Sequence, residues 1–97
     1  MDATLRRASE AIRQEEGLLS PGEIRAIRER LRLTQRAFEK LLGVGPKTAV
    51  RWEKGTVFQN ISTDSLLRLV DAQPESARFL ARIHDVTLPD FPKVAVQ

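Results

Sequence analysis

The residues with the clearest capacity for chemistry lie between positions 47 and 54, where cations recur every three or four residues. Lys47, Arg51 and Lys54 follow this spacing, and Val50 lies among them. Side chains so spaced share one face of a helix. An arginine on such a face can bind guanine O6 and N7, and an apolar neighbour suits a thymine methyl group. The pattern predicts a helix that reads base edges in a major groove. The alternative interpretation is a solvent-exposed charged surface, which has the same spacing of cations.

Two short helices joined by a glycine turn are expected to position this face. Thr34 can cap a first helix that begins at Gln35, and Gly43 suits the left-handed residue that ends it. A second helix is predicted from about Pro46 to Lys54, with Gly55 as its stop. The residues expected to be buried on these two helices are Ala37, Phe38, Leu41, Leu42, Ala49 and Trp52.

Further helices are predicted on both sides of this pair. Ser20 and Glu23 form a capping box with Pro21 between them, so a helix should run to about Leu31 or Arg32. After Gly55 a loop is expected, and then a helix capped by Ser62 or Thr63 and a last helix after Gln73-Pro74. The apolar residues expected to face the core from these segments are Ile24, Ile27, Leu31, Val57, Phe58, Ile61, Leu66, Leu67, Val70, Phe79, Leu80 and Ile83.

The fold class predicted is therefore all-α, with five helices between residues 21 and 84. We expect an N-terminal arm or linker helix over 1–19, a domain over 20–85 and a C-terminal tail over 86–97. The arm has helical spacing at Leu5, Ala8, Ala11 and Ile12. A length of 97 residues with 41% hydrophobic residues suffices for one such domain.

The charge of the chain is concentrated around the two central helices. The net charge is +3, but residues 25–54 hold nine cations against three acids, or +6, which leaves −3 for the rest. A local basic excess is the electrostatic footprint of a nucleic-acid face. The sequence lacks an apolar run of membrane-spanning length and the apolar core of a secretory signal, so we expect a soluble, cytoplasmic protein without membrane contact.

Enzymatic and metal-binding functions are not indicated. The chain contains no cysteine, and His84 is its one histidine, so neither a thiolate metal site nor a His pair is available. No nucleophile and base are suitably arranged, and the carboxylates are dispersed. We therefore expect no enzyme activity, no cofactor and no metal.

Residues 33–55, LTQRAFEKLLGVGPKTAVRWEKG, resemble the helix-turn-helix of the lambda-repressor-like (Xre-type) DNA-binding family. They are more similar still to the C-terminal domain of MqsA-type antitoxins. The serine- or threonine-capped leucine-rich helix and the step Asp71-Ala72-Gln73-Pro74-Glu75 that follow also match, and the resemblance covers roughly residues 18–83.

The resemblance implies a lambda-repressor-like helix-turn-helix bundle that represses its own toxin-antitoxin operon as a dimer on a palindromic operator. Arg51 matches the base-reading arginine of these proteins, whereas Lys47 stands where asparagine is frequent. MqsA-type antitoxins bind toxin and zinc through a cysteine-rich N-terminal domain, and this chain has no cysteine. Whether it is a fragment or a relative without that module is left open, and so is binding of a cognate toxin.

The DNA-contacting residues expected are Lys47, Arg51, Val50, Gln35, Thr48, Lys54, Arg36 and Lys40. Gln35 is either a phosphate ligand at a helix start or an ordinary first-turn residue. Thr48 is either an edge contact or a half-exposed threonine, and Arg36, Lys40 and Lys54 act through long-range attraction. Glu53 is expected to pair with an arginine. The alternative function is a protein-interaction module that dimerises or binds a toxin without reading DNA, with residues 2–16 as the contact element. For either function, the expected dimer surface is the helix from about Pro74 to His84 together with the tail.

Overall fold

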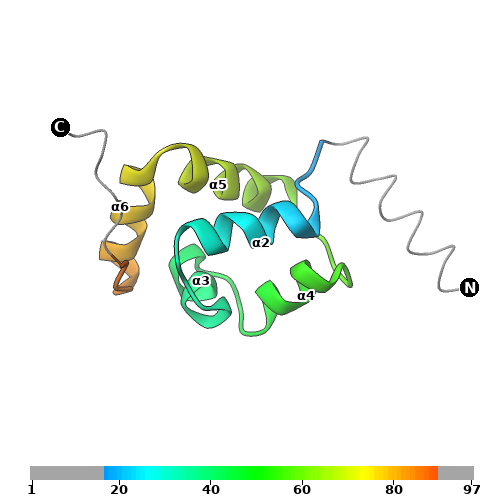
Figure 1. The fold of residues 1–97 in the computed structure, drawn as a ribbon, viewed down its shortest axis with the longest axis horizontal. Coiled ribbons are helices and arrows are strands. Elements are labelled where there is room, and N and C mark those ends of the chain that lie inside the picture. The colour runs from blue at the N-terminus through cyan, green and yellow to red at the C-terminus, as the bar shows by residue number, and fades with distance from the viewer. Residues whose placement is uncertain (1–16, 90–97) are drawn as a thin grey trace, which may run out of the picture.

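The computed structural model describes residues 17–89 of the chain, which form five helices (Figure 1). Their bounds are α2 Pro21–Arg30, α3 Gln35–Leu42, α4 Thr48–Lys54, α5 Ile61–Ala72 and α6 Pro74–His84. Residues 17–89 contain no strand, and the predicted all-α class is confirmed. The helical arm expected over 2–16 and most of the expected tail lie outside the described residues.

The caps that the sequence indicates form at α2 and α3. Ser20 Oγ accepts from the Glu23 backbone N–H at 3.1 Å, and Glu23 Oε1 accepts from the Ser20 N–H at 2.8 Å. The Thr34 hydroxyl accepts from the Ala37 N–H at 3.1 Å. Gly43 ends α3 with a φ of 76°. In this left-handed conformation glycine has no Cβ penalty, which explains why the helix stops there.

The start of α4 differs from the prediction. Pro46 lies in a turn and Lys47 has a φ of 67°, so the right-handed helix begins only at Thr48. A residue in the left-handed conformation cannot continue a right-handed helix, which explains why Pro46 and Lys47 are not part of α4. Proline at this place therefore belongs to the turn between α3 and α4, not to the first turn of α4.

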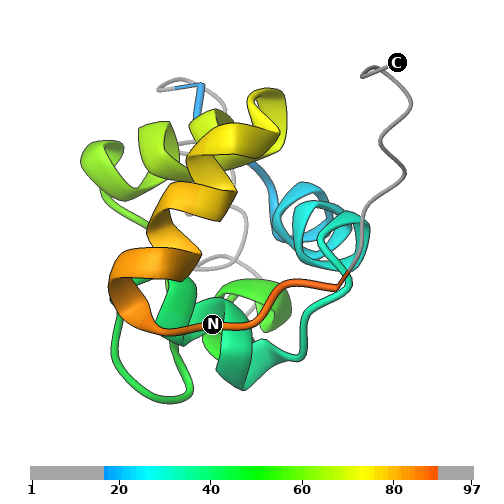
Figure 2. The same cartoon turned by 90° about the vertical axis from the view of Figure 1, so that its left-hand side faces the viewer.

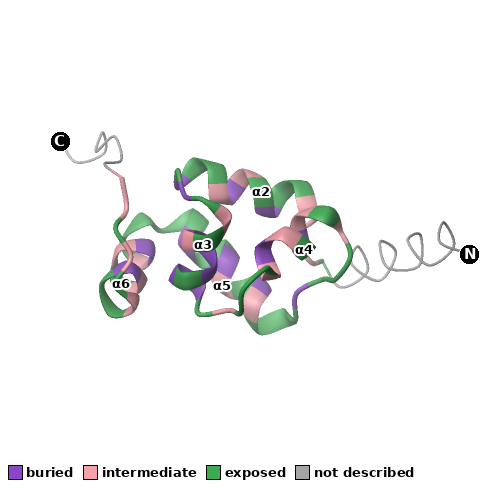
Figure 3. Ribbon diagram, turned by 90° about the horizontal axis from the view of Figure 1, so that it is seen from below, coloured by how far each residue is buried: buried purple, intermediate pink, exposed green. Residues whose placement is uncertain are grey.

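The core is formed by the inward faces of all five helices (Figure 3). Helix α2 packs against α4 and α5, while α3 packs against α4 and α6. The fully buried large side chains are Phe38, Ile24, Leu41, Leu67 and Val70, all predicted to face inward. Trp52 is buried as expected, Leu66 and Leu80 pack partly against this cluster, and so do Val86 and Leu88 beyond α6.

The prediction that the loop after α4 is buried was wrong. Val57, Phe58 and Ile61 are exposed, and Gln59 is buried instead. The Gln59 amide faces inward because Nε2 donates to Asp64 Oδ1 at 2.7 Å and to the Leu19 carbonyl at 3.1 Å. The N-cap of α5 is also not a hydroxyl residue, since Asn60 Oδ1 accepts from the Thr63 N–H.

The prediction for α6 was wrong in part, because Phe79 and Ile83 are exposed. Ala77 and Ala81 face the core in their place, and Figure 2 views the bundle from this α6 side. Alanines let the helix backbone lie close to its neighbours, which leaves the larger side chains of α6 outside. His84 Nδ1 lies 2.8 Å from the Leu41 carbonyl oxygen, a contact that ties the end of α6 to α3.

Candidate nucleic-acid interface

Helix α4 has one buried and one outward side. Ala49 is fully buried and Trp52 nearly so, as their spacing predicted. On the other side, three cations are exposed and Val50 is half-buried. We call this set the outer face of α4; its members are Lys47, Val50, Arg51 and Lys54. The helix thus presents cations around one apolar side chain, while its remaining side is fixed in the core.

The N-terminus of α4 is held by a carboxylate from α3. Lys47 makes no side-chain capping bond, and the first helical N–H groups need acceptors from elsewhere. Glu39 Oε2 accepts from the Ala49 backbone N–H at 2.9 Å, and both residues are buried. A negative charge at a helix N-terminus is also favoured by the helix dipole. Glu39 therefore fixes where the outer face begins relative to α3.

The C-terminal half of α4 is held by an ion pair with α2. Arg28 Nε lies 2.7 Å from Glu53 Oε2, and a second guanidinium nitrogen of Arg28 lies 3.1 Å from Oε1. Arg28 also donates to the Leu33 carbonyl at 3.0 Å. Gln35 Nε2 donates to Glu53 Oε1 at 3.0 Å, which adds α3 to the network. The pairing expected of Glu53 is confirmed, and its partner is Arg28.

The network sets the ionisation of both charged groups. Burial disfavours the charged form of Glu53, but the hydrogen bonds from Arg28 and Gln35 outweigh it and lower the pKa of this carboxyl group. The hydrogen bond to Glu53 raises the pKa of Arg28 against the opposing effect of burial. Both groups are therefore charged at neutral pH, and α4 is fastened at each end by a carboxylate.

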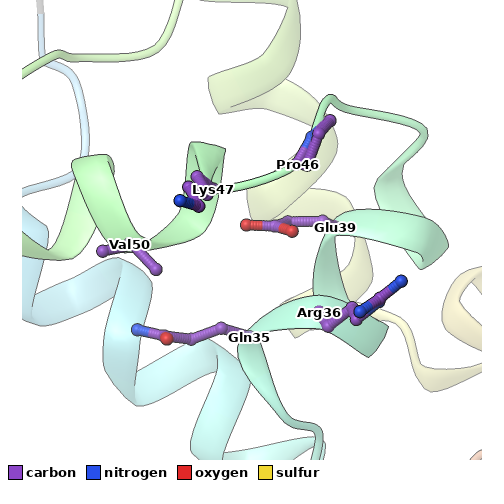
Figure 4. A pocket seen from close by; sticks show the side chains of 6 residues that line it. All are labelled: Gln35, Arg36, Glu39, Pro46, Lys47 and Val50. Carbon is purple, nitrogen blue, oxygen red and sulfur yellow. The ribbon is translucent and has the colours of Figure 1, made fainter.

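A hollow of about 310 Å³ lies between α3 and α4 (Figure 4). Its lining residues are Gln35, Arg36, Glu39, Pro46, Lys47 and Val50. In Figure 4, Gln35 and Arg36 come from the α3 side, and Lys47 and Val50 come from the α4 side. Four of the eight predicted contact residues thus border one concave site between the two helices.

The other four predicted residues lie outside the lining of this hollow. Arg51 and Lys54 are exposed farther along the outer face, and Lys40 is exposed one turn after Arg36 on α3. Thr48 is half-buried at the first position of α4. The three cations among them extend the positively charged surface beyond the hollow along both helices.

Sequence reasoning missed Glu39 as a structural part of the site. The sequence does hold a sign of this role, because Glu39 lies among Phe38, Leu41 and Leu42. An acid within such an apolar stripe has little access to water and needs a hydrogen-bond partner in the protein. The link between Arg28 and Glu53 spans 25 residues and has no local signal. Pro46 was assigned to the helix and instead lines the hollow from the turn.

Between residues 17 and 89, no helix is long and apolar enough to cross a bilayer. Within that same range, no group of three or more His, Cys, Asp and Glu side chains is arranged to hold a metal ion.

Comparison with known proteins identifies the family. The family model for MqsA, the antitoxin component of bacterial toxin-antitoxin systems, matches residues 3–80. The chain is 34% identical over 65 residues to antitoxin HigA-2 of Vibrio cholerae serotype O1 (strain ATCC 39315 / El Tor Inaba N16961). That alignment covers 67% of this chain and 62% of the relative, so the chain spans less than two thirds of the curated relative's length. With most of its length matched, this chain belongs to the MqsA family of antitoxin components of bacterial toxin-antitoxin systems.

Proposed function

We propose that this chain is a sequence-specific double-stranded DNA-binding repressor, which acts as a dimer on a palindromic operator of its own toxin-antitoxin operon. One observation carries the proposal. The outer face of α4 presents cations around Val50, while Ala49 and Trp52 fix the opposite side of the helix in the core. A rigid helix with this division is suited to insertion in a major groove.

Each side chain has a distinct role in the proposed complex. Arg51 binds a guanine bidentately, and Val50 contacts a thymine methyl group. Lys47 reaches a base edge or a phosphate from the rim of the hollow. Gln35 Nε2 carries two hydrogens and donates one to Glu53, which leaves the second for a phosphate.

The remaining predicted residues contact or attract the phosphate backbone. Thr48 is placed at the edge of the groove helix, and Lys54 ends it. Arg36 and Lys40 lie one turn apart on exposed positions of α3, where they add positive potential beside the hollow. Because each neutralised phosphate releases counterions, binding should weaken steeply with salt.

The test is a titration of the full chain with DNA from upstream of its own gene, at fixed salt. Arg51→Ala should cost about 1–3 kcal/mol of binding free energy and relax the base preference at one position per half-site. Arg82→Ala is the matched control, since it removes the same charge from α6. Unchanged affinity and base preference in Arg51→Ala, or an equal loss in the control, would refute the assignment.

We further propose that the chain binds a cognate toxin. Support comes from the family match, which begins at residue 3 and so includes the N-terminal segment before α2. Co-purification of the full chain with the product of the adjacent gene, after nuclease treatment, tests this. If the partner is retained equally by a chain lacking residues 1–17, that segment is not the toxin-binding element.

A further inference from the structure

The arginines and lysines of residues 17–89 fall into two groups, according to whether the side chain has a partner in the protein. Those with a partner are Arg25, Arg28, Arg30, Arg68, Arg78 and Arg82. Those that make no side-chain hydrogen bond, ion pair or ring contact within this range are Arg32, Arg36, Lys40, Lys47, Arg51 and Lys54. Five of these six already belong to the predicted DNA-contacting residues. The sixth, Arg32, has no assigned role.

Arg32 differs from the two arginines that precede it. Arg28 pairs with Glu53 on α4, and two residues later Arg30 Nη2 lies 2.8 Å from Asp71 Oδ1 on α5. Arg32 follows in the turn between α2 and α3, where it is exposed and has no such partner among the described residues. Its charge is therefore available to a ligand outside the protein.

The backbone of Arg32 has a conformation that suits glycine better. Its φ is 60°, in the left-handed region that a Cβ disfavours. The turn is held by the Arg32 N–H, which donates to the Glu29 carbonyl at 3.0 Å, and by the Leu33 N–H, which donates to the Arg28 carbonyl at 3.2 Å. Glycine fills the equivalent place after α3, at Gly43. An arginine here costs stability, so its presence calls for another explanation.

The other left-handed residues of the described chain suggest that explanation. Besides glycines they are Arg32, Lys47 and Asp85. Aspartate tolerates this conformation because its short side chain can bond locally, whereas lysine and arginine have no such advantage. Lys47 directly precedes α4, and Arg32 lies three residues before Gln35, the first residue of α3. Strained residues cluster at binding sites, and Lys47 is itself a predicted DNA contact. The two strained cations therefore indicate a shared role.

The turn that contains Arg32 leads into the end of α3 that borders the hollow. Gln35 lines the hollow, and Figure 4 shows it across from Val50 of α4. Three residues span at most about 10 Å, so Arg32 lies near this edge. Leu33 is buried in the core together with Phe38, which fixes how the chain enters α3. In helix-turn-helix complexes the helix before the groove helix crosses the DNA backbone, and Arg32 lies at the start of that helix.

We propose that Arg32 binds a DNA phosphate, next to the phosphate assigned to Gln35. The inference rests on the proposed function, because α4 must occupy the major groove for Arg32 to face the backbone. Arginine can bind a phosphate through two charge-assisted hydrogen bonds. A phosphate contact carries no base information, so Arg32 contributes affinity to every duplex sequence, in contrast to Arg51.

The first test measures binding of the full chain to operator DNA and to an unrelated duplex over a range of salt concentrations. Arg32→Gln should weaken both about fivefold to tenfold near about 0.1 M salt, and it should reduce the slope of log affinity against log salt by about 0.9. Arg32→Lys should keep most of that slope. Arg30→Gln is the matched control, since it removes the same charge from a side chain directed to α5. An unchanged slope in Arg32→Gln, or an equal loss in the control, overturns the inference.

Arg32→Gly separates the charge from the backbone. It should bind DNA as weakly as Arg32→Gln. Its urea midpoint should equal or exceed that of the wild type, because glycine adopts the left-handed turn without a Cβ. Weak binding by a variant of undiminished stability does not arise from unfolding. Binding of Arg32→Gly at the wild-type level would exclude the arginine as a ligand.

Duplexes in which single phosphates are replaced by uncharged methylphosphonates locate the contact. One position per half-site should weaken the wild type but not Arg32→Gln, in which the partner charge is already missing. If the wild type reads the operator and no such position exists, this inference fails and the repressor function stands. If the wild type binds all duplexes equally and Arg32→Gln still lowers the salt slope, the phosphate contact stands and sequence-specific repression fails. A wild type that binds no duplex refutes both.

Discussion

The buried Glu39 carboxylate accepts a hydrogen bond from the Ala49 backbone N–H at 2.9 Å, and this contact joins α3 to the start of α4. It replaces the side-chain cap that Lys47 does not provide. Together with the Arg28–Glu53 pair, it fixes α4 at both ends through residues that do not belong to its outer face. The orientation of the cations on the outer face is therefore set by two acidic residues, Glu39 on α3 and Glu53 on α4 itself.

Replacement of Glu39 should weaken both the fold and DNA binding. In Glu39→Ala the buried Ala49 N–H loses its acceptor, which costs about 1–3 kcal/mol of unfolding free energy. Glu39→Gln retains an oxygen acceptor and should lose less unfolding free energy than Glu39→Ala. Urea titration followed by fluorescence of Trp52, the one tryptophan, measures this. Glu29→Ala is the control, since its pair with Arg25 is exposed and should contribute under about 1 kcal/mol; equal losses would mean that the cap does not stabilise α4.

The Arg28–Glu53 pair should show strong coupling in a double-mutant cycle. Arg28→Met leaves the largely buried Glu53 carboxylate without its main partner, which should cost about 3 kcal/mol. Adding Glu53→Leu removes the stranded charge, so the double variant should be more stable than Arg28→Met alone. Urea unfolding of the four proteins gives the coupling energy. Strictly additive losses would show that the two side chains stabilise the fold independently.

Much of the helical framework could be predicted because its signals are local. The Ser20–Glu23 capping box, the Thr34 cap and the stop at Gly43 depend on residues within one turn of each other. The buried side of α4 also follows from spacing alone, since Ala49 and Trp52 are three residues apart. The predicted start of α4 was wrong because a lysine gives no indication that its backbone adopts the left-handed conformation seen at Lys47.

In the loop after α4 and in α6, contacts with residues elsewhere in the chain decide which side chains face the core and which face outward. Gln59 is buried because Leu19, 40 residues earlier, and Asp64 together satisfy its amide, and no pattern near Gln59 shows this. Phe79 is outside because the small side chain of Ala77 suits close packing of α6. Of the candidate site, the outer face of α4 could be predicted. The contact of Glu39 with the start of α4 could not, and for Glu53 only the type of its partner was predicted, not that it is Arg28.

The fold should lose stability in acid partly through Asp64. Burial disfavours its charged form, but hydrogen bonds from Leu19, Arg68 and Gln59 outweigh this and lower its pKa below the ordinary 3.8. A depressed folded-state pKa gives stability that is complete above the unfolded-state value and is lost as the pH falls through the folded-state value. The unfolding free energy should therefore be level above about pH 5 and fall below about pH 4.

Asp64→Asn tests this contribution directly, since asparagine retains an oxygen acceptor for the Leu19 N–H but cannot ionise. The variant should be less stable than the wild type at pH 7 and should lose less stability between pH 5 and pH 2.5. Urea midpoints across this range measure both effects. Glu53 has its own lowered pKa, so the variant profile should keep some slope. Parallel profiles for the two proteins would show that Asp64 does not contribute to acid sensitivity.

Replacement of Lys47 should separate stability from DNA binding. A left-handed conformation costs a non-glycine residue roughly 1–2 kcal/mol, and Lys47 adopts it with a φ of 67°. Lys47→Gly relieves this strain but makes the unfolded chain more flexible, so the net gain in unfolding free energy should be at most about 1 kcal/mol. The same change removes a cation from the rim of the hollow and should reduce operator affinity. Lys47→Ala keeps the strain, so it should lose affinity without gaining stability. Urea unfolding and operator titration of both variants give the comparison, and a Lys47→Gly protein less stable than Lys47→Ala would contradict a strained turn at this residue.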